Sequence, residues 1–124
     1  MDFKKISGQG PERISVEMLD PVMAPGVART ATAPITVSPS GLACEAELFL
    51  GPNDTTKVAT SGRKPFTSTG ASQSVSLPVT MPSPGGLAYH VYLDVFINGY
   101  RLLAYKATED VIIPSGKVDP IIWE

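Results

Sequence analysis

The side chains that most often perform catalysis are scarce in this sequence. It contains one histidine, His90, and one cysteine, Cys44. His90 falls on a polar position of an alternating segment, and no Ser-His-Asp or Cys-His spacing surrounds it. The nearest acid on the same side, Asp94, would lie roughly 13 Å away along an extended strand, too far for a hydrogen bond. We therefore expect His90 to pack on the surface against Ala107 or Tyr92 and to have no catalytic role.

The thiol and the carboxylates give no stronger indication of chemistry. Cys44 alternates with apolar residues, and a single buried cysteine usually behaves as a small hydrophobic side chain. Glu45 and Glu47 are two residues apart, and we expect both on a solvated face, where they could flank a calcium ion. The chain has no acidic calcium loop, and one cysteine with one histidine cannot form a zinc site by themselves. We predict no catalytic residue, no metal site, no cofactor and no enzymatic activity.

Composition and charge limit the partners that the protein can have. The 124 residues are 43% hydrophobic and carry a net charge of −2, which suits one folded domain and argues against a nucleic-acid partner. No run approaches the roughly 18 apolar residues of a membrane span, so we expect no membrane partner. No apolar segment follows Lys4 and Lys5, as it would in a secretory signal peptide. We expect synthesis in the cytoplasm, and a single cysteine fits that reducing compartment.

The elements that must position these residues are strands, because eleven glycines and twelve prolines interrupt the chain too often for long helices. Apolar and polar residues alternate over 42–50, 73–79 and 89–106, and a last strand is expected over 111–113. Asn98-Gly99 lies inside the longest alternating run and predicts a hairpin with a two-residue turn. The register that follows pairs Ile97 with Tyr100, Val95 with Leu102, Leu93 with Ala104, Phe96 with Arg101, and Tyr92 with Tyr105. About seven strands at this spacing predict an all-β, antiparallel sandwich over residues 35–114.

Two flanking segments complete the predicted organisation. Residues 1–34 are expected to form an extended N-terminal arm that contains one short strand, and residues 115–124 a short C-terminal tail. Both segments carry large apolar side chains that have no core of their own, and we expect a fragment 35–114 to fold without them. If the strand over 14–19 is instead the first strand of the sandwich, the fragment must start near residue 13. The sequence leaves open whether the arm and the tail pack on their own domain or on another subunit. The predicted interface residues lie in the arm, on the outer face of the hairpin and in the tail: Val22, Met23, Val27, Phe96, Tyr105, Ile121, Ile122 and Trp123.

The predicted module resembles immunoglobulin-like and fibronectin type III-like β-sandwiches. The resemblance rests on the long strand 89–97, the Asn98-Gly99 hairpin, the turn and strand over 82–92, and the closing segment 108–113. It covers residues 35–114. The Cys…Trp…Cys signature of antibody domains is absent, because Cys44 is alone and Trp123 lies in the tail.

Three functional hypotheses follow. The first is a non-enzymatic structural protein, an immunoglobulin-like module that binds protein subunits as a homo-oligomer or in a larger lattice, such as a capsid decoration or tail component of a virion. The alternative is an extracellular surface or carbohydrate-binding module, which aromatic residues on the outer face would favour and the expected lack of a leader opposes. The third, a small enzyme, is disfavoured by the scarcity of catalytic side chains. We expect the first.

Overall fold

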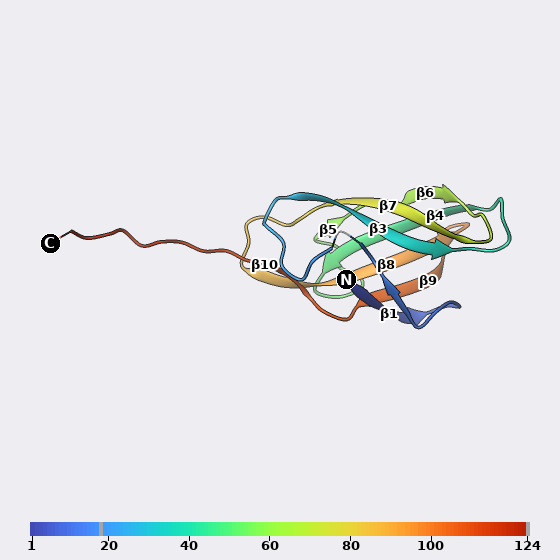
Figure 1. Cartoon of the computed structure of the whole chain (residues 1–124), viewed down its shortest axis with the longest axis horizontal. Helices are drawn as coiled ribbons and strands as arrows, with labels where there is room; N and C mark the ends of the chain where they lie inside the picture. Colours follow the sequence, from blue (N-terminus) through green and yellow to red (C-terminus); the bar gives the residue numbers. More distant parts are fainter. Residues whose placement is uncertain (18, 124) are drawn as a thin grey trace.

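The computed structural model describes residues 1–17 and 19–123, and within these ranges it contains ten strands and no helix (Figure 1). The predicted all-β, antiparallel class is confirmed. No helix in the described ranges is long and apolar enough to cross a membrane. The strands are β1 (Asp2–Ser7), β2 (Arg13–Ser15), β3 (Ala28–Thr36), β4 (Ala43–Gly51), β5 (Ala59–Thr60), β6 (Lys64–Thr67), β7 (Ser72–Thr80), β8 (Leu87–Ile97), β9 (Tyr100–Ala107) and β10 (Val111–Ile113).

The strands form two antiparallel sheets around one core. The large sheet has the order β2-β1-β9-β8-β4-β5, with β10 also paired to β8 and β6 also paired to β4. The small sheet is the pair β3-β7, which lies across the large sheet in Figure 1. The alternation predicted for 42–50 is confirmed, because Cys44, Ala46, Leu48 and Leu50 all point into the core. Leu77 of the small sheet is buried in the same core.

The hairpin between β8 and β9 turns where the sequence predicts. Asn98 and Gly99 have φ angles of 48° and 79°, as a two-residue turn with two left-handed positions requires. Ile97 pairs with Tyr100 and Phe96 with Arg101, which confirms the register next to the turn.

Beyond Phe96 the predicted register is wrong by one residue. Val95 pairs with Leu103 instead of Leu102, so that Leu102 forms a β-bulge. A bulge places two residues of one strand opposite one residue of its partner, and it therefore exchanges the two faces of the strand that follows. Leu93 accordingly pairs with Tyr105 and Tyr92 with Lys106. Tyr105, expected on the outer face, points into the core, and so does Leu103.

The N-terminal segment differs most from the expected extended arm. Strand β1 pairs with β9, and Phe3, opposite Ala107, is fully buried. Strand β3 begins at Ala28, so a boundary at residue 34 would cut through the small sheet. Pro34 does not end the strand, because β3 lies at the edge of its sheet and an edge position needs no N–H. The predicted arm is therefore part of the domain.

The C-terminal tail behaves as an extended segment. After β10 the chain leaves the domain and runs away from it (Figure 1). Of the tail residues predicted to form an interface, Ile121 is 72% exposed, Ile122 83% and Trp123 89%.

Candidate functional site

The predicted interface residues fall into two groups. Met23 and Tyr105 lie in the core, and Phe96 is buried on the outer face of the large sheet, with the Arg63 guanidinium 3.8 Å above its ring. Their burial within one chain corrects the expectation that they are free to contact another subunit. Val27 is partly buried against the core. Exposed members are Val22 and the tail residues Ile121, Ile122 and Trp123.

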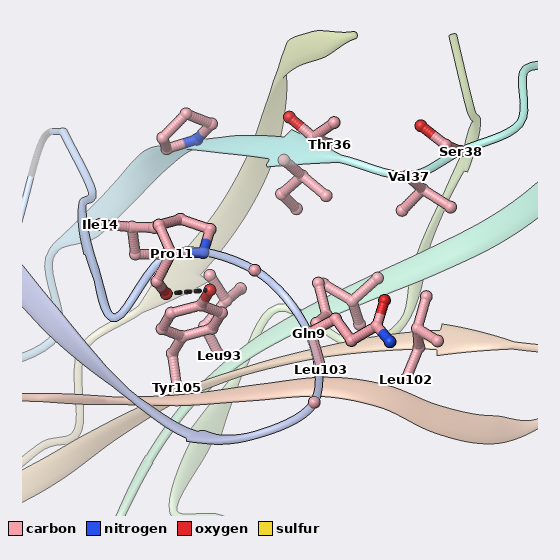
Figure 2. A pocket seen from close by; sticks show the side chains of 15 residues that line it. Gln9, Pro11, Ile14, Thr36, Val37, Ser38, Leu93, Leu102, Leu103 and Tyr105 are labelled. Atoms are coloured by element: carbon pink, nitrogen blue, oxygen red, sulfur yellow. Dashed lines mark hydrogen bonds between the residues drawn. The ribbon is translucent and has the colours of Figure 1, made fainter. Parts of the chain in front are cut away.

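A cavity opens between the two sheets, at the end of the molecule opposite the tail (Figure 1). It has a volume of about 730 Å³. Its walls are the turn 8–11 between β1 and β2, Ile14, and residues 34–38 at the end of β3 (Figure 2). Its floor is formed by the inner face of β8 and β9, including Leu93 and Leu103. We call this cavity the apolar groove.

The turn 8–11 holds one side of the groove in place. Gly8 and Gly10 have φ angles of 92° and 131°, which side chains rarely adopt. A Cβ at Gly8 would lie 2.4 Å from the carbonyl oxygen of Leu102, so the turn can approach the bulge only because residue 8 is glycine. The Tyr105 hydroxyl donates a hydrogen bond of 2.8 Å to the Pro11 carbonyl, drawn as a dashed line in Figure 2. Burial, with a smaller contribution from Glu12, raises the pKa of Tyr105, which keeps this hydroxyl a donor.

The other side of the groove is a free strand edge. Thr32 of β3 exchanges backbone hydrogen bonds of 2.9 and 3.1 Å with Glu17, so its N–H and C=O groups point away from β7. In an antiparallel strand every second residue points the same way, and Thr36 and the carbonyl of Pro34 therefore also face this edge. No strand of the described ranges pairs with that edge beyond Thr32. Both Pro34 and Thr36 are exposed.

Two carboxylates face each other on the outer side of the large sheet. Glu47 and Asp94 are direct cross-strand partners, and both are buried. Glu47 was expected on a solvated face, and this expectation is wrong because the Lys57 ammonium, at 2.7 Å, and the Thr60 hydroxyl donate to it from the segment that covers it. Burial raises the pKa of Asp94, and the charge of Arg101, 3.9 Å away, opposes that shift. The pair is covered by its own chain and offers no open position for a substrate.

The same segment covers the outer aromatic side chains. Phe49 stacks on Tyr92 with ring centroids 5.1 Å apart, and the Lys57 ammonium lies 4.9 Å from the Phe49 centroid. Basic side chains of the same chain cover these rings. No short sequence spacing indicates that these basic and aromatic residues pair.

His90 lies beside one carboxylate, that of Asp110, and Cys44 lies in the apolar core. The His90 ring packs edge to face against Tyr92, with ring centroids 6.3 Å apart, and this is one of the two contacts expected from the sequence. The Nδ1 atom of His90 lies 2.6 Å from Oδ1 of Asp110. Asp110 was not expected there, because twenty residues separate the two in sequence. Burial raises the pKa of the Cys44 thiol and keeps it protonated. Among the described residues, no group of three or more His, Cys, Asp and Glu side chains could hold a metal ion.

No protein-family model matches the sequence, and no curated protein shows significant similarity to it. The groove, the free edge and the tail are the features of this chain that bear on its function.

Proposed function

We propose that the protein is a non-enzymatic structural protein that assembles with neighbouring protein subunits through its C-terminal tail. The observation that carries this proposal is the exposure of Ile121, Ile122 and Trp123 on a segment that extends away from the domain. Burial of one such side chain is worth about 1.5–3 kcal/mol, so three of them in sequence strongly favour association. Tryptophan is also among the residues most enriched at the energetic centres of interfaces.

The fold supports the same proposal. Two antiparallel sheets and the Asn98-Gly99 hairpin are consistent with an immunoglobulin-like sandwich, which we propose as its finer relationship. A homo-oligomer or a larger lattice, such as the surface or tail of a virion, is the setting in which we propose that such a module works. The carbohydrate-binding alternative loses its main support, because Phe49 and Phe96 are buried.

Light scattering on the full chain and on a chain that ends at Pro114 tests the proposal. Residues 115–123 contribute no strand and no core residue, so the shortened chain should keep its fold. We expect the full chain to have a mass above that of the 13.1 kDa monomer, increasing with concentration, and the shortened chain to stay monomeric. A full chain that is monomeric at every concentration would contradict the proposal.

A further inference from the structure

We propose that the apolar groove binds the C-terminal tail of a second copy of this chain, with residues 121–123 added as a strand to the free edge of β3. This inference rests on the proposed assembly function, and it names the surface that receives the tail.

The groove has the size and the chemistry of a binding site for apolar side chains such as those of the tail. The cavity of about 730 Å³ falls within the range of about 300–1,000 Å³ that is typical of binding sites for small ligands. Its floor is lined by the buried side chains of Leu93, Val95 and Leu103 from the inner sheet face. The polar side chains of Ser38 and Gln9 also line it (Figure 2). An apolar floor with a polar rim is the usual anatomy of a protein interface.

The backbone groups match as well. Thr36 presents an N–H and a C=O at the free edge, and the carbonyl of Pro34 points the same way. An extended peptide that joins such an edge forms main-chain hydrogen bonds, and its alternate side chains enter the neighbouring pocket. Side chains of a strand point alternately to opposite faces. If Ile121 and Trp123 enter the groove, Ile122 faces solvent, and this arrangement buries two large side chains instead of one.

The geometry favours a second copy over the same chain. The tail leaves beside β10, at the end of the sandwich opposite the groove (Figure 1). Thr36 lies eight residues along β3 from Ala28, or about 27 Å from the end of the domain where the tail starts. Ile121 is seven residues beyond Pro114 and reaches at most about 25 Å when fully extended. Within one chain it therefore meets Pro34, about 20 Å from Ala28, only after a complete reversal of direction into a nearly straight path, whereas the tail of a second copy needs no reversal.

A contact between the tail of one copy and the groove of the next joins different surfaces. Contacts of this kind close into a ring or continue as a filament, depending on the rotation between copies. This geometry suits a lattice.

The decisive experiment mixes a donor and an acceptor chain. Thr36→Pro removes the edge N–H, as Pro34 already does two residues earlier, and leaves the tail intact; this chain is the donor. The double variant Ile121→Ala/Trp123→Ala keeps the groove and lacks the tail anchors; this chain is the acceptor. Trp123 is the only tryptophan of the protein, so the fluorescence of the mixture comes from the donor tail alone. Circular dichroism confirms that each chain is folded.

We expect each chain to be monomeric by itself, and the mixture to form a heterodimer with a shift of the Trp123 emission to shorter wavelength. Ile121→Ala in the otherwise unchanged protein should weaken self-association at least tenfold, whereas the matched control Ile122→Ala should change it less than threefold.

Three results would overturn the inference. If folded Thr36→Pro assembles as well as the unchanged protein, assembly occurs elsewhere, and the proposed function stands while the groove does not. If the Trp123 emission lies at short wavelength in a monomer at every concentration, the tail occupies its own groove. If Ile122→Ala weakens assembly as much as Ile121→Ala, the tail does not bind as a strand in the proposed orientation. A full chain that never assembles would instead contradict the proposed function itself.

Discussion

Asp94 is a buried carboxylate that faces another carboxylate, Glu47, and burial raises its pKa. The folded protein therefore keeps a proton on Asp94 at pH values where the unfolded chain has already lost it. The contribution of this group to stability is present below its usual pKa of 3.8 and is lost as pH rises through the higher pKa of the folded state. Asp94→Asn should therefore become more stable relative to the unchanged protein as pH rises above about 3.8.

Urea unfolding from pH 3 to pH 7 measures this difference. Asp119→Asn, on the exposed tail, serves as the control and should give the same pH dependence as the unchanged protein. If the free energy of unfolding of Asp94→Asn and of the unchanged protein varied with pH in parallel, Asp94 would have the same pKa in the folded and the unfolded chain, contrary to this prediction.

Gly99 has a φ of 79°, which disfavours a β-branched side chain, and the space around its Cβ position is open. Any loss of stability in Gly99→Val therefore reports the backbone conformation alone. We expect a loss of about 1–3 kcal/mol in chemical unfolding. Gly116→Val, also in open space but without a positive φ, should be neutral. An equally neutral Gly99→Val would be inconsistent with the observed turn.

At the scale of elements, the bulge at Leu102 and the turn 8–11 depend on each other. The bulge turns Tyr105 inward, and its hydroxyl then binds the Pro11 carbonyl across the sheet. Tyr105→Phe removes that hydrogen bond and should cost about 0.5–1.5 kcal/mol of stability. Hydrogen exchange should show faster exchange in the turn 8–11. The control is Tyr100→Phe, at a side chain that is 55% exposed, and it should leave this exchange unchanged. Unchanged exchange in Tyr105→Phe would mean that other contacts, such as the hydrogen bond from the Lys5 N–H to the Glu12 carbonyl, hold the turn.

The same elements show how far the sequence determines the fold. Alternation over 42–50 and 89–97 and the Asn98-Gly99 turn predicted strands, faces and hairpin correctly, because these signals are local. The bulge at Leu102 could not be predicted, since any residue near it could have been the extra one. Strand β1 could not be predicted either, because Phe3 is its one fully buried anchor and its partner is β9, about a hundred residues later.

The candidate site was only partly predictable, for the same reason. The exposed tail residues were recognisable from composition, because large apolar side chains followed a glycine and a proline. The groove was not, because it is assembled from three segments that are distant in sequence: the turn 8–11, residues 34–38, and the strands β8 and β9. The covering of Glu47 by Lys57 likewise depends on how the chain between them folds back.

At the scale of the whole molecule, the pairing of the N-terminal strands defines the smallest part that can fold. A fragment 35–114 was expected to fold by itself, and the structure leads to the opposite prediction. The fragment lacks β1, β2 and all of β3 except its last two residues, so β7 loses its partner. It also lacks the buried side chains of Phe3, Val16 and Met23. Removing a single large buried side chain costs about 2–5 kcal/mol, and the total stability of a domain is about 5–15 kcal/mol.

We therefore expect fragment 35–114 to be unfolded, while a chain of residues 1–114 unfolds cooperatively like the full protein. Tryptophan cannot serve as the probe, because Trp123 is absent from both chains. Far-ultraviolet circular dichroism and the dispersion of amide proton resonances distinguish the two states. Adding the peptide 1–34 to the fragment provides the control, since the missing strands supplied in trans should restore β structure if their pairing is what the fragment lacks. A fragment that folds cooperatively by itself would show that β3 and β1 are dispensable, and the N-terminal segment would then be free to act as an arm.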